Sequence, residues 1–174
     1  MKRFEKPTTR RVAALGISAA LALVLSYVEF LLPPLYPILP AVKCGLANIA
    51  VTFVLYRFGK SYAAALAGVK VLLSALLFGS AVSLVYSAAG ACLSLAVMIV
   101  MMLPKQKSGE GFFSPIGVSV GGGVAHNVGQ IAAACVMMRT AELAAYLPVL
   151  LISGTLAGAL VGIAAAIAIK RVKI

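Results

Sequence analysis

Residues 82–103 read VSLVYSAAGACLSLAVMIVMML and contain no charged side chain. A helix rises about 1.5 Å per residue, so this stretch is long enough to cross the roughly 30 Å hydrocarbon core of a bilayer. The rest of the chain has the same character, because hydrophobic residues make up 63% and charged residues 11% of its 174 residues. A soluble domain is usually about half apolar and about a quarter charged. The sequence therefore predicts an integral membrane protein.

Six apolar stretches predict an all-α bundle of about six transmembrane helices in a single domain. They cover approximately residues 11–32, 44–56, 61–78, 82–103, 115–138 and 143–169. The second stretch is short for a full span, so we expect it to be tilted, shielded by its neighbours or partly re-entrant. Prolines block a helix in residues 33–43, which we expect to cap the outer end of the bundle. Residues 104–114 are expected to form a polar cytoplasmic loop.

The basic residues predict how the bundle is oriented. With six spans and a cytoplasmic N-terminus (residues 1–10), the inner side holds all but three of the 15 lysines and arginines. The exceptions are Lys43, Lys70 and Arg139. This distribution satisfies the positive-inside rule and predicts a multi-pass protein of the plasma membrane with both termini in the cytoplasm. The net charge of +11 then reflects topology, so we expect no nucleic-acid partner.

Two ladders of small residues, spaced four apart, predict close helix contacts. The first consists of Ala14, Ser18 and Ala22, and the second of Gly154, Gly158 and Gly162. Small residues let helix backbones approach closely in lipid, where burial of apolar surface does not drive association. Each ladder is consistent either with packing inside the bundle or with docking onto a separate membrane subunit.

Seven polar side chains lie in or beside the apolar stretches, between the expected outer surface and the membrane midplane. They are Glu29, Lys43, Asn48, Lys70, His126, Asn127 and Gln130. An ionisable group inside a membrane costs about 2.5–3.5 kcal/mol on insertion scales, so such residues are candidates for function. His126 and Gln130 are four residues apart and share a helix face.

If these side chains converge, they line a polar pocket that opens to the outside beneath residues 33–43. Lys43 and Lys70 would favour a small ligand that carries phosphate or carboxylate, and the amides and the histidine would orient it by hydrogen bonds. A purely structural alternative remains open, in which Lys70 pairs with Glu29 and the amides bond across helices.

The composition argues against several kinds of enzyme. The chain contains no aspartate, whereas prenyl-chain synthases, phosphatases and kinases use Asp-rich sites to hold Mg²⁺. One histidine and four scattered glutamates do not form an ordinary metal or general-base site. We therefore expect no metal, no cofactor and no catalytic residue.

Two segments resemble a known family. Val42-Lys43-Cys44-Gly45-Leu46-Ala47-Asn48-Ile49 resembles the "GLAN" segment of the Gx transporter family. Residues 114–120, SPIGVSV, followed by 125–130, AHNVGQ, resemble its second hallmark. That family is also labelled heptaprenyl diphosphate synthase component I, and the resemblance extends from about Arg10 to Lys170. The family is similar in size and span count to the substrate-binding S components of energy-coupling factor (ECF) transporters.

The resemblance implies a fold and a function. S components have six helices, bind a vitamin or similar nutrient from outside, and dock on a membrane coupling subunit driven by two ATPases. Small residues of their first helix meet the coupling subunit, and Ala14, Ser18 and Ala22 would correspond, with serine in place of a central alanine. The ligand would be small and polar, either anionic or similar to a vitamin or flavin. The alternatives are an accessory membrane subunit of heptaprenyl diphosphate or quinone biosynthesis, and a subunit of a flavin-based extracellular electron-transfer complex.

Overall fold

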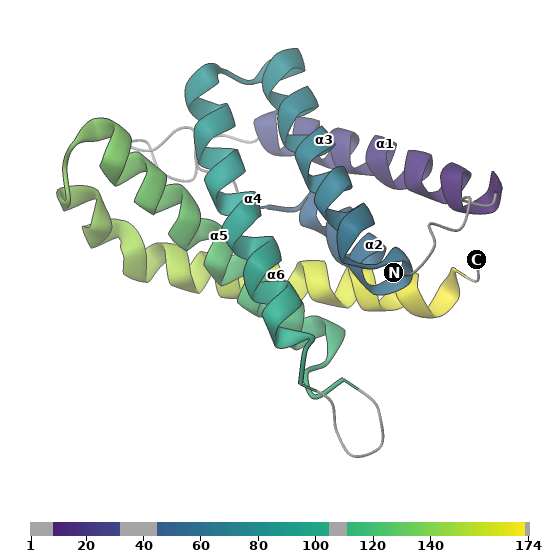
Figure 1. Cartoon of the computed structure of the whole chain (residues 1–174). Helices are drawn as coiled ribbons and strands as arrows, with labels where there is room; N and C mark the ends of the chain where they lie inside the picture. The colour runs from purple at the N-terminus through teal and green to yellow at the C-terminus, as the bar shows by residue number, and fades with distance from the viewer. Residues whose placement is uncertain (1–8, 32–44, 105–110, 173–174) are drawn as a thin grey trace, which may run out of the picture.

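The computed structural model describes residues 9–31, 45–104 and 111–172, which form six α-helices and one short 3-10 helix (Figure 1). The helices are α1 (Thr9–Leu31), α2 (Asn48–Phe58), α3 (Lys60–Phe78), α4 (Ala81–Met101), α5 (Pro115–Met138), η1 (Glu142–Tyr146) and α6 (Leu147–Arg171). No β-strand occurs in these three ranges. The predicted all-α bundle of six helices is therefore confirmed.

Four helical segments are long and apolar enough to cross a membrane: α1, α3, α4 and the continuous Glu142–Arg171. The 24-residue α5 also has the length of a span, but it carries glycines, a serine, a histidine and two side-chain amides. It makes its most extensive contacts with α4 and α6 (Figure 1). Because its neighbours enclose it, α5 can carry polar side chains that lipid would not accept. The chain is thus a multi-pass membrane protein.

Helix α2 is too short to cross the membrane. Its 11 residues span about 16 Å, roughly half of the hydrocarbon core. Only Gly59, with a φ of 94°, separates it from α3, and this left-handed turn favours glycine. At the same end, the Arg57 guanidinium donates hydrogen bonds to the carbonyls of Ile169 and Val172, near the end of α6. The N-terminus of α2 therefore lies deep in the bundle, while Cys44, its expected first residue, lies outside the described residues.

Serine side chains fix the starts of α4 and α5. The Ser83 N–H donates to Ser80 Oγ at 3.2 Å, and the Gly117 N–H donates to Ser114 Oγ at 3.1 Å. Pro115 follows in the first turn of α5, where its missing N–H has no consequence. The sequence SPIG at residues 114–117 is thus a helix-start signal. Of the expected 104–114 loop, residues 105–110 lie outside the described ranges.

The glycine ladder of α6 lies against α5. A Cβ atom added at Gly154 would lie 2.9 Å from the carbonyl oxygen of Gly123. One added at Gly158 would lie 2.8 Å from that of Ser119. At Gly162 the added atom would lie 2.7 Å from the Cα of Ile116. These glycines therefore let the two backbones touch, which is the packing that small residues allow in lipid.

Helix α1 lies at the edge of the bundle and contacts α2 and α3 (Figure 1). Its buried residues are Ser18, Ala22 and Ser26, whereas most of its larger apolar side chains are exposed to the surroundings. Ala14 is half-buried, and its carbonyl accepts a hydrogen bond from Ser18 Oγ at 2.7 Å. The small residues of α1 thus face its own bundle in this structure.

Candidate functional site

A small internal cavity lies where α1, α3, α4 and α5 meet the turn before α2. Its lining residues are Ser26, Glu29, Gly45, Lys70, Ser74, Ser87 and His126. The cavity volume is about 10 Å³, which is about the space needed for one water molecule. Three side chains predicted from the sequence to meet, those of Glu29, Lys70 and His126, therefore surround one void.

The turn before α2 places the N-terminus of this short helix beside the cavity. Glu29 Oε1 accepts a hydrogen bond of 2.8 Å from the Leu46 N–H, two residues before α2 begins. A helix N-terminus carries unpaired N–H groups and a partial positive charge, so a carboxylate there is favourable. Gly45 has a φ of 83°, and a Cβ there would lie 2.9 Å from Asn48 Nδ2. Both the turn and the close contact thus require glycine.

Lys70 places a positive charge at about the middle of α3. Its side chain is buried, and Nζ donates to Asn48 Oδ1 at 2.9 Å. The Glu29 carboxylate and the Lys70 ammonium line the same cavity, so the site combines a cation, an anion and an imidazole. Opposite charges beside one cavity offset part of each other's desolvation cost. The site therefore presents both donors and acceptors to whatever enters it.

His126 and Gln130 share a face of α5 and pack against Gly90 of α4. A Cβ at Gly90 would lie 2.9 Å from His126 Nδ1 and 2.9 Å from Gln130 Cγ. Gln130 is 0% exposed, and neither atom of its amide has a hydrogen-bond partner among the described residues. A buried polar group without a partner costs roughly 1–3 kcal/mol, so such an amide indicates either function or an additional partner.

Asn127 does not belong to this cavity. Its Nδ2 donates to the Leu150 carbonyl at 2.7 Å and to Ser153 Oγ at 3.2 Å, both on α6. Successive helix residues are separated by about 100°, so Asn127 points away from the side that His126 faces. Its observed contacts join α5 to α6. Lys43, which we also expected in the site, lies outside the described residues.

A second void of about 10 Å³ continues from the turn toward the other end of the bundle. Gly45 lines both voids, and the second also contacts Asn48, Thr52 and Ser119. Thr52 is 0% exposed, and its hydroxyl oxygen has no hydrogen-bond partner in the described part of the chain. Polar groups therefore follow one face of α2 from the site into the interior.

The sequence did not single out the three serines of the cavity or Gly90. Ser26 precedes Glu29 by three residues, and Ser74 follows Lys70 by four, so both share a helix face with a charged residue. Ser87 precedes Gly90 by the same helical interval of three. The spacing from Glu29 and Lys70 was the available signal for the first two.

The cavity is lined by side chains that can form hydrogen bonds with a polar molecule. Among the described residues, no group of three His, Cys, Asp or Glu side chains is placed to hold a metal ion. What the cavity offers is an ammonium, a carboxylate, an imidazole and three hydroxyls. These groups can orient a small polar molecule through several hydrogen bonds.

The fold and the site together define a multi-pass helical membrane protein with polar side chains around an internal cavity. Residues 18–168 match the family model described as heptaprenyl diphosphate synthase component I. Because the match covers most of the chain, the protein belongs to this family, which confirms the resemblance seen around Asn48 and His126. The chain matches no curated protein and no solved structure.

Proposed function

We propose that the protein is the substrate-binding subunit of a transport system in the plasma membrane, similar in role to an ECF S component. It captures a small polar ligand from outside, either anionic or similar to a vitamin or flavin. Partner subunits, namely a membrane coupling protein and ATPases, supply the energy. The observation that carries this proposal is the convergence of Glu29, Lys70 and His126 on one cavity beside the N-terminus of α2.

The energetics support a role for this cluster beyond packing. Several ionisable and amide groups at one depth of a membrane bundle are costly, and the amide of Gln130 lacks a partner among the described residues. A ligand that hydrogen-bonds to these groups would offset that cost. The N-terminus of a broken helix, with its partial positive charge, is also suited to an anionic group.

Ligand identification tests the proposal directly. Protein purified in mild detergent should retain a small molecule that mass spectrometry can identify. With that molecule in hand, Lys70→Met and His126→Ala should each weaken binding about 10- to 100-fold, as expected for the loss of a buried hydrogen bond to a charged group. Lys60→Met is the matched control, because Lys60 is exposed at the start of the same helix. Unchanged binding in both cavity variants would refute the site.

The family description supports a second candidate function, that of an accessory subunit in heptaprenyl diphosphate synthesis. In that role the chain would bind the prenyl product or anchor a soluble catalytic partner, since no aspartate is available to hold Mg²⁺. An elongation assay with prenyl diphosphate and Mg²⁺ distinguishes the two. Activity that a soluble partner shows only when this protein is present would favour the accessory role over transport.

A further inference from the structure

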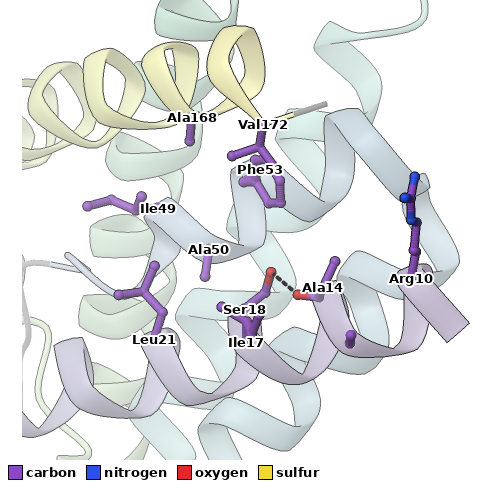
Figure 2. A pocket seen from close by; sticks show the side chains of 11 residues that line it. Arg10, Ala14, Ile17, Ser18, Leu21, Ile49, Ala50, Phe53, Ala168 and Val172 are labelled. Carbon is purple, nitrogen blue, oxygen red and sulfur yellow. Dashed lines mark hydrogen bonds between the residues drawn. The ribbon is translucent and has the colours of Figure 1, made fainter. Parts of the chain in front are cut away.

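An open apolar groove separates α1 from α6 at the end of the bundle where α1 begins and α6 ends (Figure 2). It has a volume of about 490 Å³, far larger than the cavity around Lys70. Helix α2 contacts both α1 and α6, and its residues Ala50 and Phe53 line the groove between them. Except for Arg10 and Ser18, its lining side chains are apolar, so the groove suits a hydrocarbon chain.

The dimensions of the groove match one leaflet of a bilayer. On α1 it extends from Arg10 to Leu21, and 11 residues of helix span about 16 Å. Half of the hydrocarbon core is about 15 Å thick. Figure 2 shows Arg10 at one end of this row and Leu21 at the other, with Ile17 between them. An acyl chain lying along the groove would thus extend from the membrane surface to about the midplane.

The positive charge at the Arg10 end of the groove favours a lipid with an anionic headgroup. Arg10 itself lines the groove, and exposed cations on the described part of the same end are Arg11, Arg57, Lys60, Lys170 and Arg171. The described carboxylates lie elsewhere, with Glu29 near the opposite end of α1 and Glu142 before α6. Clustered basic residues at a membrane surface attract anionic lipids.

We propose that this groove binds one anionic phospholipid from the leaflet that faces the basic end of the bundle. One acyl chain occupies the space between α1 and α6, over α2, and the phosphate meets the Arg10 guanidinium. The lipid fills a gap that would otherwise leave α1 poorly supported on this side. The proposal is independent of the polar cavity and of the ligand bound there.

Native mass spectrometry of the full chain, with added phosphatidylglycerol or phosphatidylcholine of equal chain length, tests this site. We expect one tightly retained phosphatidylglycerol and weaker retention of phosphatidylcholine. Arg10→Gln should lower phosphatidylglycerol retention about fivefold, whereas Arg11→Gln, with the same loss of charge outside the groove, should have a smaller effect. The proposal would be overturned if both lipids were retained equally, or if both arginine variants lost phosphatidylglycerol retention equally. Either result would mean that the basic surface attracts lipids without a specific site.

Two further variants test the groove itself. Ala13→Trp places a large side chain in the groove beside Arg10 and should abolish specific retention. Gly16→Trp is its control, because nothing lies within 4 Å of a Cβ added there. Retained binding in Ala13→Trp would refute the site, and thermal melting in detergent checks that both variants fold. A photo-crosslinker at Ile17, applied in native membranes, should yield a lipid adduct; a protein adduct would assign the groove to a partner helix instead.

Discussion

Gln130 is the residue with the largest unexplained cost in the described part of the bundle. Both polar atoms of its side chain are buried without a hydrogen-bond partner there. Asn127, three residues earlier, donates two hydrogen bonds to α6, and only its Oδ1 has no partner among the described residues. Two amides of the same helix therefore have different roles. Asn127 joins α5 to α6, while Gln130, one turn beyond His126 and outside the cavity lining, has an amide without a partner among the described residues.

This contrast yields a prediction for stability. Gln130→Leu should raise the free energy of unfolding by roughly 1–3 kcal/mol in ligand-free protein, because it removes two unpaired polar atoms and keeps most of the volume. It should also weaken ligand binding. Asn127→Leu should instead destabilise the protein, by about 0.6–1.7 kcal/mol, because it removes hydrogen bonds that are made. Unfolding titrations in detergent measure both; a destabilising Gln130→Leu would show that this amide already has a structural partner.

At this scale the sequence singled out Glu29, Lys70 and His126 but not the three serines that line the same cavity. Lys70 and His126 stood out because charged and imidazole groups are expensive inside apolar spans. Asn127 was grouped with His126 by adjacency, although helical rotation directs it to α6. Ser74 carried no signal of its own, because a serine in an apolar helix can bond to its own backbone, as Ser74 Oγ does to the Val71 carbonyl at 3.2 Å.

Among the helices, the contact between α5 and α6 depends most on small residues. A Cβ added at Gly158 would meet the backbone of α5, at 2.8 Å from Val120 Cα, and backbone atoms cannot move aside as a flexible side chain can. The same is true of Gly123, whose added Cβ would lie 2.5 Å from the Gly154 carbonyl oxygen. The two helices thus pack backbone against backbone, while the His126 face of α5 packs against Gly90 of α4.

Gly158→Ala should therefore separate α5 from α6 and destabilise the protein by about 1–3 kcal/mol, the usual range for overpacking. Gly16→Ala on α1 is the matched control, because its new methyl group meets nothing within 4 Å. That control should be neutral or slightly stabilising, since alanine favours helix more than glycine does. Thermal melting of the purified variants measures the difference. Equal melting temperatures would mean that the helix pair tolerates the added methyl group.

Element boundaries were predicted well where polar residues mark them and poorly where they do not. The start of α5 at Pro115 follows from the Ser-Pro signal, and the structure places it there. The start of α2 was expected near Cys44 but lies at Asn48. Gly45, Leu46 and Ala47 have the same apolar character as the residues of the helix that follows. Hydropathy therefore does not reveal the turn at Gly45, where φ is positive. The sequence thus predicted that α2 is short, but not that it begins at Asn48.

In the whole molecule, the helices differ in how firmly they are held. Among the described helices, α5 makes the most extensive contacts, with α4 and α6, whereas α1 makes its main contacts with α2 and α3. The number of helices followed from hydropathy, and Arg10 and Val172, near the two described ends, line the same groove. For α1, the ladder of Ala14, Ser18 and Ala22 marked a contact face but left open whether it packs inside the bundle or docks on another subunit; the structure buries Ser18 and Ala22 inside the bundle.

The loose attachment of α1 matters because the polar cavity is too small for the proposed ligand. It holds about one water molecule, so a vitamin-sized molecule can enter only if its walls separate. Helix α1 contributes Ser26 and Glu29 to those walls. Near this end, α1 is held to α3 by aromatic contacts, with ring centroids of Tyr27 and Phe78 5.5 Å apart. We therefore expect α1 to move away from α3 when ligand binds.

A cross-link across this contact tests the movement. Tyr27→Cys and Phe78→Cys, joined by a short bismaleimide in a background without the native cysteines, should weaken ligand binding about tenfold by lowering the open population. The same double variant, capped with a monofunctional maleimide, is the control and should bind as the unmodified protein does. Because the cross-link lies outside the cavity lining, it changes access without removing a ligand contact. Undiminished binding in the cross-linked protein would mean that α1 stays in place and that the ligand enters between other helices.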